Sequence, residues 1–183
     1  NQGQAQAIIS QTHELTAQYP RSFILWNILG VANKSLGKIA EATNAFMKVT
    51  QYNPHYADGY SNLGVALGDQ GQLDEAIAAY KKAIQLKPGF FEAYNNMGTA
   101  LRRKDSIEEC IKSYNKAIAL KPDYIEAYNN LGVAMAKSGK LEEALEAYSK
   151  ALAIKPDYAE AYSNMGVALK DQGKLEEAIE AYN

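Results

Sequence analysis

Residues 125–158 read IEAYNNLGVAMAKSGKLEEALEAYSKALAIKPDY, and this stretch decides the fold because the chain repeats its pattern. The five prolines lie 34 residues apart, and aromatic residues, glycines and small residues recur with the same period. The positions are Pro20, Pro54, Pro88, Pro122 and Pro156; Trp26, Tyr60, Tyr94, Tyr128 and Tyr162; Gly30, Gly64, Gly98, Gly132 and Gly166; and Ala42, Ala76, Cys110, Ala144 and Ala178. This period and these residue types indicate stacked helix pairs, so the fold class is all-α.

Each repeat is expected to hold two helices. In residues 125–158 the spacing i, i+3, i+4, i+7 of one helix face is met by Tyr128, Leu131, Gly132 and Met135. This first helix should end near Lys137. A second helix should run from Leu141 to Lys155, because Pro156 disfavours helical geometry in the residue before it.

A glycine is expected to end each first helix, as Gly139 does, because glycine adopts a left-handed conformation at no steric cost. Asp105 occupies this position in residues 91–124. Aspartate tolerates that conformation less well than glycine. We therefore expect the turn at Asp105 to be strained or differently shaped.

Small residues should let the two helices of a repeat approach closely. Gly132 and Ala144 provide this room in residues 125–158, and Tyr148 is expected to fill the gap between repeats. Cys110 takes the place of the alanine in its repeat, and we interpret it as a small buried hydrophobic residue.

The repeats form one array over residues 1–183. The complete repeats are 23–56, 57–90, 91–124 and 125–158, while 1–22 matches the second helix of a preceding repeat and 159–183 begins another. Neither end carries the polar capping helix that natural solenoids need. We therefore expect the sequence to be a segment of a longer protein.

Composition excludes several classes of function. Lysine and arginine total 19 against 21 acidic residues, and they are scattered, which argues against a nucleic-acid partner. The apolar stretches are far shorter than the roughly 20 residues of a membrane-spanning helix, so we expect no membrane partner. A single cysteine cannot form an internal disulfide, which is consistent with a reducing, cytoplasmic location.

Catalytic chemistry finds no support in the residues. His13 and His55 are the only histidines, and neither has a nucleophile or metal ligand at a meaningful spacing. The glycines occur singly and form no phosphate-binding loop. We expect no catalytic residue, no metal and no cofactor, and therefore no enzyme within this segment.

Two motifs carry a resemblance to a known family. Tyr94-Asn95-Asn96-Met97-Gly98 and Tyr128-Asn129-Asn130-Leu131-Gly132, with Ala144, Tyr148 and Pro156 following, resemble tetratricopeptide repeats over nearly the whole chain. The resemblance implies a right-handed α-solenoid whose first helices line a concave groove. Most members of the family are protein-interaction scaffolds. The resemblance therefore implies that the partner is a protein or an extended peptide.

The sixth residue of the first helix faces this groove in the family. It is asparagine in four repeats, at Asn62, Asn96, Asn130 and Asn164, and isoleucine at Ile28. The run resembles the asparagine ladder of O-linked N-acetylglucosamine transferases, which grips the backbone of bound polypeptides. A primary amide offers donors and an acceptor, so it can bond a peptide backbone whatever its side chains. With first helices about 10 Å apart, successive asparagines match roughly three residues of extended chain.

Two alternatives remain open for the groove residues. The asparagines could instead bond to neighbouring helices and merely satisfy polar groups there. The resemblance also places further residues in or near the groove: Asn95, Asn129, Arg102, Arg103 and Lys137. The basic ones could meet an acidic side chain of a ligand or form a solvated face. The lysine and asparagine of the family's carboxylate clamp are absent from the fifth and ninth positions.

Three functions are compatible with the sequence. The first is a non-enzymatic scaffold that holds an extended peptide or a partner segment in the groove. The second is the substrate-recognition arm of a larger enzyme, such as a glycosyltransferase of the kind named above. The third is a structural role in which the uncapped ends self-associate.

Overall fold

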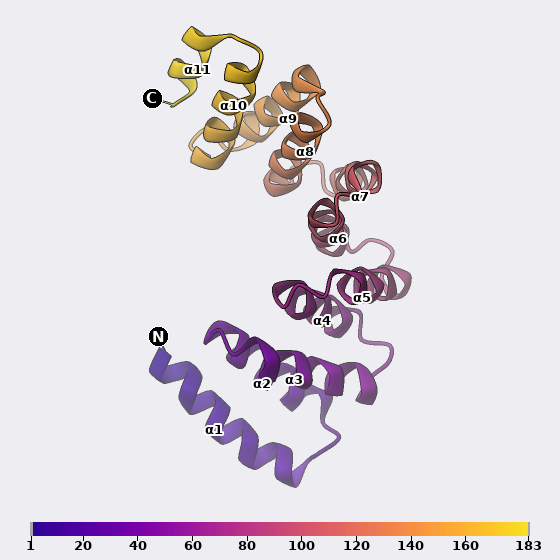
Figure 1. The fold of residues 1–183 in the computed structure, drawn as a ribbon. Coiled ribbons are helices and arrows are strands. Elements are labelled where there is room, and N and C mark those ends of the chain that lie inside the picture. Colours follow the sequence, from indigo (N-terminus) through magenta and orange to yellow (C-terminus); the bar gives the residue numbers. More distant parts are fainter. Residues whose placement is uncertain (1, 183) are drawn as a thin grey trace. The chain divides into compact units, whose positions relative to one another are not determined.

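The structure is a computed structural model that describes residues 2–182 (Figure 1). These residues form eleven α-helices and no strands. The helices are α1 (Gln2–Gln18), α2 (Phe23–Ser35), α3 (Ile39–Tyr52), α4 (Ala57–Asp69), α5 (Leu73–Leu86), α6 (Phe91–Arg103), α7 (Ile107–Leu120), α8 (Ile125–Lys137), α9 (Leu141–Ile154), α10 (Ala159–Asp171) and α11 (Leu175–Tyr182). The predicted fold class, an all-α array of tandem helix-turn-helix units, is confirmed.

The chain forms two compact units, Asn1–Gly89 with α1 to α5 and Phe90–Asn183 with α6 to α11. In the first unit α2 packs against α3 and α4 against α5, while α1 packs against α2. In the second unit the pairs are α6 with α7, α8 with α9 and α10 with α11. Each pair is one repeat, with a first helix of thirteen residues and a second helix that begins four residues later.

The first helices end in the same hydrogen-bonded turn. Gly71 has φ +80°, its N–H bonds to the Gly68 carbonyl at 3.0 Å, and the Gln72 N–H bonds to the Leu67 carbonyl at 3.0 Å. This pair of bonds satisfies carbonyls that the end of a helix leaves open, and it requires a left-handed residue. Glycine therefore suits the position.

Asp105 keeps this turn without a glycine. Its φ is +65°, its N–H bonds to the Arg102 carbonyl at 3.1 Å, and the Ser106 N–H bonds to Leu101 at 3.0 Å. Of the two outcomes expected for this turn, the different shape is therefore wrong, and the strain stays a prediction. The hydrogen bonds of the turn hold the backbone in place, and aspartate accepts the left-handed conformation.

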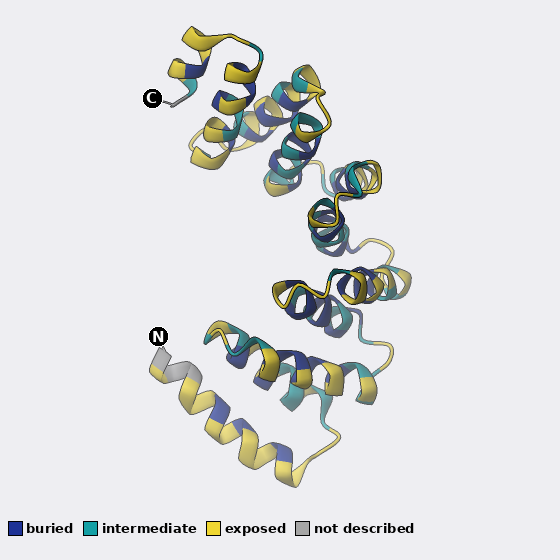
Figure 2. Cartoon of the chain, in the orientation of Figure 1, coloured by how far each residue is buried: buried dark blue, intermediate teal, exposed yellow. Residues whose placement is uncertain are grey.

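An aromatic ring over a glycine joins the two helices of a repeat. A Cβ added to Gly98 would lie 2.6 Å from a ring carbon of Tyr114, and one added to Gly64 would lie 2.7 Å from Tyr80. Tyr148 covers Gly132 of its own repeat in the same way, and it also belongs to a buried cluster with Ala168 of the next repeat. Buried residues accordingly form a band along the paired helices (Figure 2).

Candidate functional site

Hydrogen-bonded asparagines connect the first helices of the second unit. The Asn130 side-chain N–H donates to Asn95 Oδ1 at 3.0 Å, and that of Asn164 donates to Asn129 Oδ1 at 2.9 Å. Both bonds join residues 35 positions apart, one more than the repeat length. Neighbouring first helices therefore run parallel and in register, with the sixth residue of one beside the fifth residue of the helix before.

The first unit contains the same bond. Asn62 of α4 donates from its side-chain amide to Asn27 Oδ1 of α2 at 3.1 Å. Ile28, which stands at the sixth position of α2, is 41% exposed. In this unit the sixth position is therefore isoleucine in α2 and asparagine in α4, whereas α6, α8 and α10 each carry an asparagine at that position.

The two asparagines of a bonded pair lie in different environments. Asn95 and Asn129 are buried, with exposures of 6% and 1%. The Asn129 amide is used on both sides, because its Oδ1 accepts from Asn164 and its N–H donates to Glu160 Oε1 at 3.0 Å. The structure thus places Asn95 and Asn129 beneath the surface, where they orient the asparagines of the next helix.

The asparagines at the sixth position remain partly exposed. These residues are Asn62, Asn96, Asn130 and Asn164. A primary amide has two N–H donors and an acceptor oxygen, and the bond to the preceding helix uses one donor. In Asn62, Asn130 and Asn164 that bond leaves the other donor and Oδ1 for a further partner. The amides of Asn62, Asn130 and Asn164 therefore bond to a neighbouring helix, as one of the two alternatives predicted, and they are also partly exposed.

Helical spacing determines which residues share a face with these asparagines. On α8, Glu126, Asn130, Val133 and Lys137 are separated by the four, three and four residues that share one helix face. We call the surface formed by these positions on the first helices of one unit the amide surface of that unit. On α8, Asn130 and Val133 are partly exposed, and Glu126 and Lys137 are exposed.

Basic residues lie at the C-terminal end of the amide surface. Lys137 Nζ is 2.6 Å from Asp105 Oδ1, in an ion pair whose side chains are 48% and 75% exposed. Such an exposed pair contributes little to stability and leaves the lysine able to meet another carboxylate. Arg103 is exposed, whereas Arg102 is only partly exposed.

Arg102 extends toward the interior of its repeat. Its Nε is buried and has no hydrogen-bond partner among the described residues. Burial raises the pKa of Tyr148 to about 12, and the Arg102 guanidinium partly opposes this rise because it favours the phenolate. Arg102 therefore lies close to the tyrosine rings that join the helix pairs, and only part of its side chain is available at the surface.

Carboxylates mark the N-terminal end of the amide surface. Burial raises the pKa of Tyr124 to about 12, and Glu126 and Glu92 add to the rise. The Tyr158 hydroxyl donates to Glu160 Oε2 at 3.0 Å. Acidic residues in the first turn also favour the helix dipole, so these carboxylates have a structural role without any ligand.

Reactive chemistry is not evident in the described part of the chain. Burial raises the pKa of the Cys110 thiol to about 11, which keeps it protonated and unreactive at neutral pH. No group of three or more histidine, cysteine or acidic side chains within residues 2–182 could hold a metal ion. None of the helices described here combines the length and hydropathy needed to cross a bilayer.

Helix pairs whose first helices run parallel and are joined in register by side-chain bonds define a helical-repeat protein. Models described as TPR repeat and tetratricopeptide repeat match residues 24–56, 45–78, 68–105, 98–139 and 136–173. The chain therefore belongs to the tetratricopeptide repeat family, as the sequence motifs predicted.

Solved structures share this fold. MamA is 30% identical with a TM-score of 0.76, and the match covers 87% of each chain. A chain of the APC/C hetero-tetramer Cut9-Hcn1 is 21% identical with a TM-score of 0.84, over 98% of this chain and 36% of that one. YrrB, described as a TPR protein with an unusual peptide-binding site, is 20% identical with a TM-score of 0.72, over 93% and 88%. None of the curated proteins compared with the chain matches it significantly.

Family and fold support a coarse functional assignment. The chain is a tetratricopeptide repeat protein whose fold is that of protein-interaction scaffolds, and its structural neighbours include a peptide-binding protein and a subunit of a protein assembly. Nothing in the described residues indicates catalysis.

Proposed function

We propose that the amide surface of the second unit binds an extended polypeptide through the backbone of that polypeptide. The observation that carries the proposal is the pair of bonds that hold Asn130 and Asn164 in place while leaving their amides partly exposed. An amide fixed in this way loses little side-chain entropy when it bonds a ligand. Backbone recognition makes the surface tolerant of ligand sequence.

The neighbouring residues have different parts in this proposal. Asn95 and Asn129 position the exposed amides and do not touch the ligand. Lys137, Arg103 and the exposed part of Arg102 would meet acidic side chains of the polypeptide, because guanidinium and ammonium groups pair with carboxylates. The peptide-binding site named for YrrB supports the proposal by analogy of fold alone.

The proposal is tested by replacing Asn96, Asn130 and Asn164 together with alanine. An array of twelve-residue peptides supplies the ligands, and fluorescence anisotropy measures affinity for the peptides that bind. We expect a loss of at least tenfold for all of them, since the amides contact only backbone, together with nearly unchanged helicity by circular dichroism. The matched control is Asn115→Ala, which removes an exposed asparagine from the second helix α7.

Two outcomes would contradict the proposal. One is a wild-type protein that binds no peptide of the array. The other is a triple variant with the affinity of the Asn115→Ala control. A loss restricted to peptides of one sequence would assign recognition to side chains instead of the backbone.

Self-association is a second candidate, favoured by a separate observation. Leu175 and Ile179, one turn apart on α11, are 60% and 61% exposed. Two large apolar side chains on one helix face would be covered by a second copy of the chain. Sedimentation velocity should then show association that increases with concentration and is lost in the Leu175→Ser, Ile179→Ser variant. A monomer at every concentration would exclude this role.

A further inference from the structure

Asn33 of α2 departs from the repeat pattern at a buried position. The equivalent residue is apolar in the other repeats, where it is Leu67, Leu101, Met135 and Leu169. Asn33 is nonetheless only 4% exposed. A buried amide costs free energy unless it is hydrogen-bonded, so an asparagine at this position needs an explanation.

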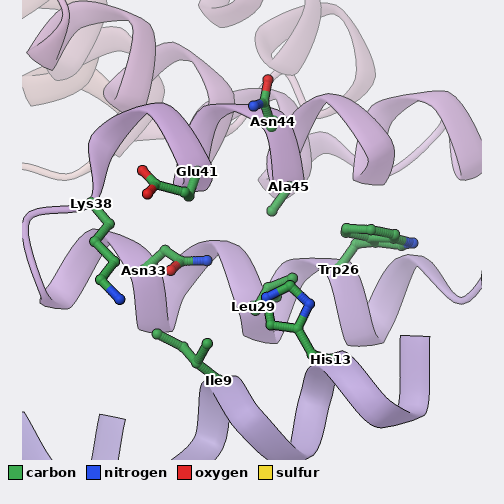
Figure 3. A pocket seen from close by; sticks show the side chains of 9 residues that line it. All are labelled: Ile9, His13, Trp26, Leu29, Asn33, Lys38, Glu41, Asn44 and Ala45. Carbon is green, nitrogen blue, oxygen red and sulfur yellow. The ribbon is translucent and has the colours of Figure 1, made fainter. Parts of the chain in front are cut away.

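The Asn33 side chain faces a cleft between α1 and α3 (Figure 3). The cleft has a volume of about 320 Å³. Its floor consists of Ile9 of α1, Leu29 of α2 and Ala45 of α3, which are 5%, 3% and 1% exposed. Asparagine has nearly the shape of the leucine that stands here in three other repeats, but it brings an amide to the wall of the cleft instead of two methyl groups.

Polar groups surround this apolar floor. In Figure 3 the Asn33 amide lies between Ile9 below and Glu41 above, with Lys38 at one end of the cleft and Trp26 at the other. The Trp26 indole N–H donates to the Pro20 carbonyl at 2.8 Å, which fixes the ring as a wall. Within the described part of the chain the Asn33 side-chain amide has no hydrogen-bond partner, and its backbone carbonyl accepts the N–H groups of Leu36 and Lys38.

These features together are those of a small-molecule site. Ligand pockets are concave and mostly apolar, carry a few convergent polar groups and begin at about 300 Å³. An unpaired amide at the wall of an open cleft pairs best with a group that offers it both a donor and an acceptor. The apolar floor requires that the rest of the ligand be apolar and compact.

We propose that the cleft binds a compact aromatic carboxamide. The ligand's carboxamide would pair with the Asn33 amide through two hydrogen bonds, and its ring would lie on Leu29, Ile9 and Ala45 against Trp26. A polar substituent would reach Lys38 or Glu41 at the mouth. The site lies on a different side of α2 from the amide surface and does not rest on the proposed peptide binding.

Benzamide is the probe for this site, and ethylbenzene, which has a ring but no amide, is the control compound. We expect benzamide to cause saturable shifts in the backbone amide signals of Leu29, Asn33 and Ala45 in a nuclear magnetic resonance titration. Its dissociation constant should be at least tenfold lower than that of ethylbenzene. Absence of saturable shifts, or equal affinity for the two compounds, would overturn the proposal.

Two variants remove the amide and leave the cleft open. Asn33→Leu keeps nearly the same shape without any hydrogen-bonding group, so benzamide affinity should fall at least tenfold, ethylbenzene affinity should not fall, and the midpoint of thermal unfolding should rise. Asn33→Ser keeps the cleft open but removes the amide, so benzamide affinity should fall at least tenfold while ethylbenzene affinity stays the same. Unchanged benzamide affinity in either variant would show that the probe binds elsewhere.

Discussion

Tyr114 lies so close to Gly98 that this one pair of residues sets the distance between α6 and α7. The glycine has no Cβ, and the space that a Cβ would need is taken by the ring. Interiors are packed densely enough that one additional carbon is felt. The same contact occurs in the other complete repeats, so each helix pair depends on one position that only glycine can fill.

Gly98→Ala should lower the free energy of unfolding by about 1 to 3 kcal/mol, because the added methyl group forces Tyr114 out of place. Urea denaturation followed by circular dichroism measures the change. Gly89→Ala is the control, since a Cβ there would meet no atom within 4 Å. Equal stability of the two variants would contradict the contact.

The buried amide of Asn129 has a structural role of its own. Asn129→Ala should cost about 1 to 3 kcal/mol of unfolding free energy, because it creates a small cavity and leaves the Asn164 amide without its acceptor. The exposed Asn115→Ala should change stability by less than about 0.5 kcal/mol. Chemical denaturation distinguishes them, and equal midpoints would show that the Asn129 bonds contribute nothing.

At the level of the helices and turns, the hydrogen bonds that close each first helix determine the backbone more strongly than residue type does. Asp105 adopts a left-handed φ of +65°, close to the +73° to +80° of the glycines in the other repeats, and the hydrogen bonds of the turns agree in length within 0.2 Å. An unfavourable residue in such a turn therefore lowers stability without changing the shape of the turn.

Asp105→Gly should raise the unfolding free energy by up to about 1 kcal/mol, since the left-handed conformation costs glycine nothing and the exposed ion pair with Lys137 contributes little. Asp105→Ala removes the ion pair but keeps the strain, so this variant should be no more stable than the wild type. Thermal unfolding of the three proteins provides the test. A glycine variant less stable than wild type would show that the ion pair outweighs the strain.

Helix bounds could be predicted from the sequence because they depend on local signals, namely the spacing of apolar residues, the turn glycines and the prolines. The sixth-position asparagines could be placed on the first helices for the same reason. What could not be predicted was that Asn95 and Asn129 lie buried beneath them, because fifth and sixth positions look equally polar in the sequence. A comparison of the eleventh position across repeats would have singled out Asn33, but only packing shows that a cleft results.

For the molecule as a whole, the burial of tyrosines should make the free energy of unfolding fall at alkaline pH. Burial raises the pKa values of Tyr124, Tyr148 and Tyr158 from 10.0 to about 12. A group whose pKa is higher in the folded state contributes stability that is complete below its unfolded pKa and is lost as pH rises through the folded value.

The urea midpoint should therefore stay constant from neutral pH to about pH 9 and fall between pH 10 and about pH 12. Absorbance of the tyrosinate form, measured in parallel, should show some tyrosines ionising only together with unfolding. If all tyrosines ionised near pH 10 with the helices intact, the rings would not be buried in solution.

The bond between an asparagine and the residue 35 positions earlier has a consequence for how such a gene can change length. The bond forms where asparagine stands both at the fifth position of one first helix and at the sixth position of the next, so a gain or loss of a whole 34-residue block keeps the bond only at junctions that bring two such asparagines together. Ser61 and Ser163 at the fifth position therefore mark the blocks after which a new junction would lack it.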